Sequence, residues 1–168
     1  SLHDALKIYL IFGNQGNDYI DGGLNNDSIY GGQNNDVVWG KDGNDVIFGN
    51  LGKDSLMGNS GQDSLYGGQE NDYLWGGLGE DWLFGDIGND VVSGSDGNDI
   101  IFGNQGSDEL FGNAGNDSIY GGQDHDSICA GEGKDLLLGN LGDDLILGGA
   151  DDDTLYGGQG NDTLVGGE

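Results

Sequence analysis

The stretch GNQGNDYID at residues 13–21 is the first of seventeen similar nonapeptides that follow one another along the chain. An Asp recurs every nine residues from Asp18 to Asp162 without a gap, and an aliphatic residue always follows it by two positions. Gly stands five positions before each Asp, except where Ala130 replaces it. The unit is G-[GN]-x-G-N-D-x-U-x, where U is aliphatic. Self-similarity at a fixed short period is typical of a solenoid.

Composition by itself points to disorder and excludes several partners. The chain has 168 residues, with 38 Gly and no Pro, and its formal net charge is -27. The absence of Pro excludes a collagen helix. The charge excludes nucleic acid and anionic membrane surfaces as partners, because both are polyanions. We therefore expect the chain to remain unfolded unless cations neutralise it.

The positions within the unit predict an all-β fold. Gly and Asn tolerate positive φ, so the first six residues are expected to form a bend. The last three residues alternate around one aliphatic side chain, which is typical of a short strand. So short a strand is stable only when stacked, each one pairing with the strand two units away. The prediction is a right-handed parallel β-roll, a β-helix solenoid with two units per turn and about eight and a half turns.

The unit resembles the glycine- and aspartate-rich nonapeptide of the RTX (repeats-in-toxin, haemolysin-type calcium-binding) family. The resemblance covers about nine tenths of the chain, from Gly13 to Val165. It implies a secreted calcium-binding module, which we interpret as a piece of a larger protein and not as an enzyme. It further implies type I secretion, in which low calcium inside the cell keeps the chain unfolded and high calcium outside folds it.

The Asp ladder is the predicted calcium site. Turns two units apart are expected to stack, so that Asp18 lies above Asp36 and oxygen atoms line the gap between them. Hard oxygen ligands suit Ca²⁺ better than zinc or copper. At most about fifteen gaps form, and fifteen Ca²⁺ would bring +30 against the formal -27. The predicted ligands are Asp18, Asp27, Asp36, Asp45, Asp54, Asp63, Asp72, Asp81, Asp90, Asp99, Asp108, Asp117, Asp126, Asp135, Asp144, Asp153 and Asp162.

An alternative interpretation of the ladder needs no metal. Asp side chains in turns often accept hydrogen bonds from nearby backbone N–H groups. We favour the metal because stacked carboxylates about 5 Å apart repel one another strongly when no Lys or Arg lies between them.

The expected organisation is a lead-in strand or degenerate repeat at residues 1–12, seventeen repeats at residues 13–165 and a truncated turn at residues 166–168. The fourth position departs from Gly in five units. Glu is the least suited of these substitutes to a left-handed conformation. The five residues are Asn25, Asn34, Glu70, Asp124 and Asp151.

The ninth position is expected to point outward, and on one face of the roll it forms a ladder of mostly aromatic residues. We favour a role in stabilising the sheet through cross-strand contacts. The alternative is an adhesion or carbohydrate-binding module that docks another domain or a glycan on this face. The ladder comprises Tyr30, Phe48, Tyr66, Phe84, Phe102, Tyr120, Leu138 and Tyr156.

No combination of residues predicts catalysis. His125 occupies a variable position of a turn, without a nucleophile or a second His in its motif. Cys129 is alone in the chain and is expected to be a packing residue.

Overall fold

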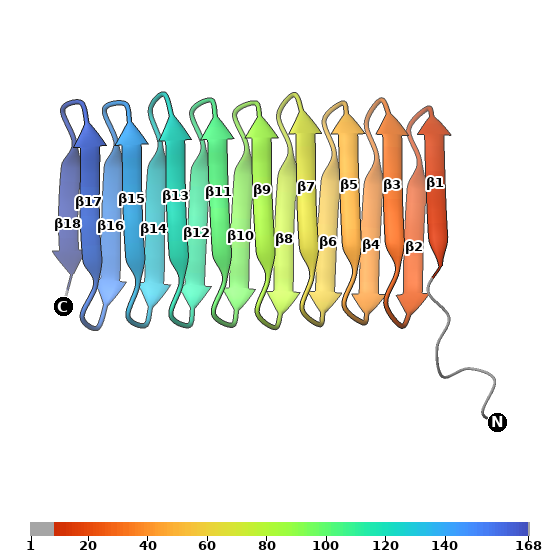
Figure 1. The fold of residues 1–168 in the computed structure, drawn as a ribbon, viewed down its shortest axis with the longest axis horizontal. Coiled ribbons are helices and arrows are strands. Elements are labelled where there is room, and N and C mark those ends of the chain that lie inside the picture. The colour runs from red at the N-terminus through yellow and green to blue at the C-terminus, as the bar shows by residue number, and fades with distance from the viewer. Residues whose placement is uncertain (1–8, 168) are drawn as a thin grey trace.

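The computed structural model describes residues 9–167, and this part of the chain consists of eighteen short β-strands joined by turns, with no helix (Figure 1). The odd-numbered strands form one nine-stranded sheet: β1 Leu10–Gln15, β3 Ser28–Gln33, β5 Val46–Leu51, β7 Ser64–Gln69, β9 Trp82–Ile87, β11 Ile100–Gln105, β13 Ser118–Gln123, β15 Leu136–Leu141 and β17 Thr154–Gln159. The even-numbered strands form the other: β2 Tyr19–Leu24, β4 Val37–Asp42, β6 Ser55–Ser60, β8 Tyr73–Leu78, β10 Val91–Asp96, β12 Glu109–Ala114, β14 Ser127–Glu132, β16 Leu145–Ala150 and β18 Thr163–Gly167.

Every strand pairs in parallel with the strand one coil further along the chain. Ile29 of β3, for example, is in register with Ile47 of β5, eighteen residues later. In Figure 1 the odd strands run upward in front, the even strands run downward behind, and successive coils advance from right to left, which makes the coil right-handed. The predicted parallel β-roll with two repeats per turn is therefore confirmed.

The division of the repeat into bend and strand was wrong. The strands are six residues long, apart from the five of β18, and the turns between them are three residues long. β3 thus continues past the predicted boundary through Gly31 and Gly32 to Gln33. The reason is that every coil bends in the same way at the same place. Asn14, at φ 77°, therefore still pairs in register with Gly32 of the next coil.

The core is a double row of aliphatic side chains between the two sheets. The aliphatic residues at the eighth position, from Ile29 to Ile146, are almost completely buried, with at most 2 % exposure. Those of the last two units are less covered, and Leu164 in β18 is 43 % exposed. The predicted inward direction of this position is confirmed. Among the described residues no helix is long and apolar enough to cross a membrane.

All five departures from Gly at the fourth position adopt the left-handed conformation that the turn requires. Glu70 has φ 77°, close to the 78° of Asn25. A left-handed conformation costs a residue with a Cβ about 1–2 kcal/mol. The turn geometry is therefore imposed on Glu70 by the coils on either side.

The structure covers part of the predicted terminal segments. Of the lead-in segment at residues 1–12, residues 1–8 lie outside the described residues, and Leu10–Phe12 form the first half of β1. Of the segment at residues 166–168, Gly166 and Gly167 end β18, and Glu168 lies outside the description.

Candidate metal centre

The predicted ligand residues all lie in the turns, where they form two ladders along opposite edges of the roll. Asp18 and every second Asp after it follow an odd strand, at the upper edge in Figure 1, and Asp27 and its series follow an even strand at the lower edge. The fourteen from Asp27 to Asp144 are at most 3 % exposed. Asp18, Asp153 and Asp162, at the ends of the roll, are partly exposed. Burying so many carboxylates demands a compensating interaction.

One oxygen of each ladder carboxylate from Asp27 to Asp162 accepts a hydrogen bond from a backbone N–H. The backbone N–H of Asp54 donates to Oδ1 of Asp72 over 2.8 Å, and the N–H of Asp72 donates to Oδ1 of Asp90 over 2.8 Å. The same bond links each Asp to the one eighteen residues later, from Asp18 to Asp162, at 2.7–3.1 Å. The expected stacking of turns two units apart is confirmed. The side-chain-to-backbone bonds of the alternative interpretation are also present.

The second oxygen of the carboxylates has no partner. Oδ2 is buried and makes no hydrogen bond in sixteen consecutive ladder residues, from Asp18 to Asp153. A buried polar atom without a partner costs about 1–3 kcal/mol, and more when the group is charged. The hydrogen bonds of the alternative interpretation therefore satisfy only half of each carboxylate, and the other half is free to bind a cation.

The glycine at the first position of the repeat lies directly beside the free oxygen. A Cβ on Gly67 would lie 2.5 Å from Oδ2 of Asp72 and 2.7 Å from the carbonyl oxygen of Gly85 in the next coil. The space that a side chain would fill is thus bordered by a carboxylate oxygen and a main-chain oxygen. The same arrangement recurs along the roll, and Ala130 is the one residue that places a methyl group there.

The negative charge of the buried ladder favours the binding of protons or cations to its carboxylates. Burial raises the pKa of Asp72 to about 8, against the opposing effect of the hydrogen bond from Asp54, and the neighbouring charges of Asp90, Asp54 and Glu70 raise it further. Burial likewise raises the pKa of Asp63 to about 7. Between residues 9 and 167 the one ion pair joins Lys134 and Asp152, both largely exposed. No basic side chain therefore neutralises the ladder, and protons or metal ions must do so.

The donor set suits Ca²⁺, provided that the main chain takes part. Within the described chain, no three His, Cys, Asp or Glu side chains form a group that could hold a metal ion by themselves. Ca²⁺ takes six to eight oxygen ligands, and backbone carbonyls are among its usual donors. A carboxylate Oδ2 beside a Gly carbonyl oxygen fits that preference, and it offers none of the nitrogen or sulfur that zinc prefers.

His125 takes part in the turn structure. Its Nδ1 accepts a hydrogen bond of 2.9 Å from the backbone N–H of Asp143, one coil further on. Asn44 makes the same link in another coil, where its side-chain oxygen accepts from the N–H of Gln62. The side chain at this position of the repeat thus serves as an acceptor between coils, and His125 takes that structural role.

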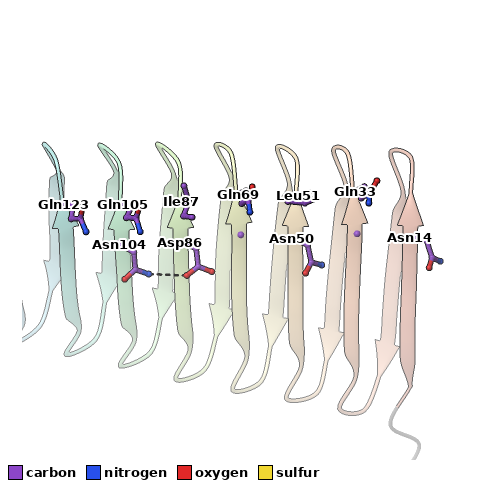
Figure 2. Close-up of a pocket in the computed structure, with 12 residues that line it drawn as sticks. Asn14, Gln33, Asn50, Leu51, Gln69, Asp86, Ile87, Asn104, Gln105 and Gln123 are labelled. Carbon is purple, nitrogen blue, oxygen red and sulfur yellow. Dashed lines mark hydrogen bonds between the residues drawn. The ribbon is translucent and has the colours of Figure 1, made fainter.

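A polar groove of about 930 Å³ runs across the outer face of the odd-numbered strands, at their C-terminal ends (Figure 2). Its walls are mainly amide side chains such as Asn50, Gln69 and Gln105. Asp86 is the one carboxylate among the lining residues, and Nδ2 of Asn104 lies 3.4 Å from its Oδ1 (Figure 2). The groove therefore lacks the repeated carboxylates of the turn ladders and is a separate feature of the surface.

Comparison with known proteins agrees with the geometry. A family model of the RTX calcium-binding nonapeptide repeat, which spans four copies of the repeat, matches the chain at residues 10–38, 30–65, 48–83, 57–92, 75–110, 102–137 and 138–168. No curated protein matches the chain. The family matches together extend from residue 10 to residue 168. The repeat, the stacked turns and this match lead to one conclusion: the chain belongs to the family of RTX calcium-binding nonapeptide repeat proteins.

Proposed function

We propose that this β-roll folds when Ca²⁺ binds in the gaps between its stacked turns, and that the Asp ladders supply the side-chain ligands. The observation that supports the proposal is the row of sixteen buried Oδ2 atoms without a hydrogen-bond partner. Each ion would take a carboxylate oxygen of the ladder together with main-chain oxygens such as that of Gly85. Bound Ca²⁺ would supply the positive charge that the ladder lacks.

Charge explains why the chain would need the ion in order to fold. The formal net charge is -27, and the turns bring seventeen Asp residues to two edges of a narrow roll. Like charges at this spacing oppose the compact state. An ion that binds the folded chain better than the unfolded one shifts the equilibrium toward folding. With about fifteen gaps, folding would depend steeply on the Ca²⁺ concentration.

Circular dichroism during a calcium titration tests the proposal. We expect metal-free protein at pH 7.5 to show a disordered spectrum, and Ca²⁺ at about 0.1–1 mM, a range typical of extracellular calcium modules, to produce the strand spectrum. Mg²⁺ should fail to do so, because it requires near-ideal octahedral geometry and dehydrates reluctantly. A strand spectrum that is present without metal and unchanged by Ca²⁺ would refute the proposal.

Calorimetry of the same titration measures the number of ions bound. The upper limit expected from the stacking is about fifteen per chain. Asp72→Asn should lower this number, because it replaces a buried Oδ2 by an amide nitrogen that cannot bind a cation. Asp42→Asn removes the same charge from an exposed side chain outside the ladders and should leave the number unchanged.

The setting that we propose for the module is extracellular. Folding that depends on Ca²⁺ would keep the chain unfolded in a cell interior with little free calcium and would fold it outside. Such a module would serve type I secretion and would act as one part of a larger secreted protein without catalysing a reaction itself.

The aromatic ladder is better explained by sheet stabilisation than by glycan binding. From Phe12 to Tyr120, consecutive rings stack with centroids 4.7–5.1 Å apart. The planes of Tyr66 and Phe84 are parallel, with an angle of 0° between them. Each ring face is covered by the next ring, so only the ring edges remain for a partner. Docking of a glycan or of another domain on this ladder stays the alternative function.

A further inference from the structure

The outer face of the even-numbered sheet contains a gap that the odd-numbered sheet lacks. Met57, Trp75, Ser93 and Phe111 occupy the ninth position on the consecutive strands β6, β8, β10 and β12, and each is in register with the next. Ser93 is the one small side chain among them. A cavity of about 440 Å³ opens at this place, and Met57, Tyr73, Trp75, Val91, Ser93 and Phe111 are among its lining residues. We call this cavity the Ser93 slot.

The size of the slot is set by the spacing of the strands. On the odd-numbered sheet each strand from β1 to β13 holds a ring of the ladder, and consecutive rings lie 4.7–5.1 Å apart, whereas β15 holds Leu138 at this position. Trp75 and Phe111 lie two strands apart with Ser93 between them, so their backbones are separated by about 9.5 Å. The space between their side chains is therefore the space that one stacked ring occupies on the odd-numbered sheet. One flat aromatic ring fits between them.

The walls of the slot are apolar and open to solvent. Tyr73 is 61 % exposed and Trp75 is 58 % exposed. Oγ of Ser93 already accepts a hydrogen bond of 3.0 Å from Nδ2 of Asn113. Neither side chain beside it, Trp75 or Phe111, offers a charge. A ring that entered the slot would remove apolar surface from water on both of its faces.

Carboxylates on either side of the slot determine the charge of a ligand. Glu109 of β12 is exposed and in register with Val91, a lining residue. A second hollow of about 480 Å³ shares Met57 and Trp75 with the slot, and Asp96 is among its lining residues. No Lys lies among the lining residues of either cavity. These charges repel an anionic ligand and attract a cationic one.

We propose that the Ser93 slot binds a small aromatic cation, with one flat ring inserted between Trp75 and Phe111 and the positive group directed toward the neighbouring carboxylates. The ring fills the space above Ser93, and the side chains of Trp75 and Phe111 stack against it as the rings of the other sheet stack against one another. A cation close to the face of Trp75 adds a further attraction.

The test uses three probes with the same indole ring and different charges: tryptamine, indole and indole-3-acetate. Their affinities for the full chain, folded in saturating Ca²⁺, are measured by calorimetry or by ligand-observed NMR. Tryptamine should bind most tightly, indole less tightly and indole-3-acetate most weakly. Equal affinity for all three, or tightest binding of the acetate, would contradict the proposed ligand charge.

Variants separate the slot from general attraction to an acidic protein. Ser93→Phe supplies the missing ring and should weaken tryptamine binding by about tenfold or more, because stacking on both walls is lost. Leu147→Phe is the matched control, since it adds the same ring at the same position of β16, away from the slot, and it should bind tryptamine like the original chain. Tryptamine affinity that survives in Ser93→Phe would overturn the site.

A second variant covers the case in which Ser93→Phe disturbs the fold. Phe111→Ala removes one wall and adds no bulk, so it should weaken tryptamine and indole alike while the circular dichroism spectrum stays unchanged. Unaltered binding to a folded Phe111→Ala protein would place the ligand elsewhere and refute the slot.

Discussion

The buried Asp ladders predict that acid can replace calcium in folding this chain. Ten ladder carboxyls have a pKa raised from 3.8 to between about 6 and about 8. Burial is the main cause, and in most of them the charges of neighbouring Asp residues raise the pKa further. A backbone hydrogen bond to each carboxylate lowers the pKa in part. The ten carboxyls are those of Asp45, Asp54, Asp63, Asp72, Asp81, Asp90, Asp99, Asp108, Asp117 and Asp126.

The sign follows from linkage between protons and folding. The folded-state pKa values lie above the unfolded value of 3.8, so the folded chain binds more protons between pH 4 and about 8. The stability from these groups is fully present below the unfolded pKa and is lost as the pH rises through about 6 to 8. In the absence of metal, lowering the pH from 8 to 5 should therefore favour the roll.

The number of carboxyls sets the steepness of this transition. Each proton taken up on folding changes the free energy of unfolding by about 1.4 kcal/mol per pH unit. Ten such protons change it by on the order of 10 kcal/mol per unit, a limit reached only near pH 5, because five of the ten carboxyls have a pKa of about 6. A typical domain has only about 5–15 kcal/mol of stability in total. Folding of the metal-free chain should therefore be complete within about one to two pH units.

The assay is circular dichroism of metal-free protein titrated from pH 8 to pH 5, without a chelator, and sedimentation confirms that the protein stays monomeric. The titration stops above the isoelectric point of about 4.1, where the loss of net charge promotes precipitation. A soluble, metal-free chain that shows no strand spectrum at pH 5 would contradict the link between protonation of the ladder and folding. So would a folding transition whose pH dependence corresponds to a single proton.

Three further predictions concern single residues. Asp72→Asn should stabilise the metal-free chain at pH 7.5, because it removes a carboxyl, with a folded-state pKa of about 8, that must take up a proton when the metal-free chain folds. It should also raise the Ca²⁺ concentration needed for folding, because a carboxylate ligand is lost, and Asp42→Asn should change neither. Glu70→Gly should raise the stability of the calcium-loaded roll by about 1 kcal/mol in thermal unfolding, because Gly relieves the strain at φ 77°, and an unchanged midpoint would count against strain there. Gly61→Ala should destabilise the roll far more than Gly16→Ala in the same assay. A Cβ on Gly61 meets the carbonyl oxygen of Gly43, whereas a Cβ on Gly16 meets nothing within 4 Å. Equal losses of stability would contradict the close stacking of the turns.

The fold could be predicted almost completely because each coil repeats the same local sequence pattern. The aliphatic residue at the eighth position, as in Ile47, indicated the inward face, and the recurrence every eighteen residues indicated which strands pair. The length of the strands could not be predicted in this way. Local preference at Gly31 and Gly32 favours a bend, and only the identical bend in the next coil provides partners that extend β3 to Gln33.

Part of the candidate site could be predicted from the sequence in the same way, and part of it could not. The stacking of Asp residues along two edges, with no basic residue between them, could be predicted because a fixed period places equivalent residues above one another. The use of each carboxylate could not be predicted, because it depends on contacts between coils: Oδ1 of Asp72 accepts a hydrogen bond from the N–H of Asp54, while its Oδ2 remains free beside Gly67. The Ser93 slot likewise depends on the tertiary structure. Its size is set by the side chains of the neighbouring strands, which lie eighteen residues away along the chain.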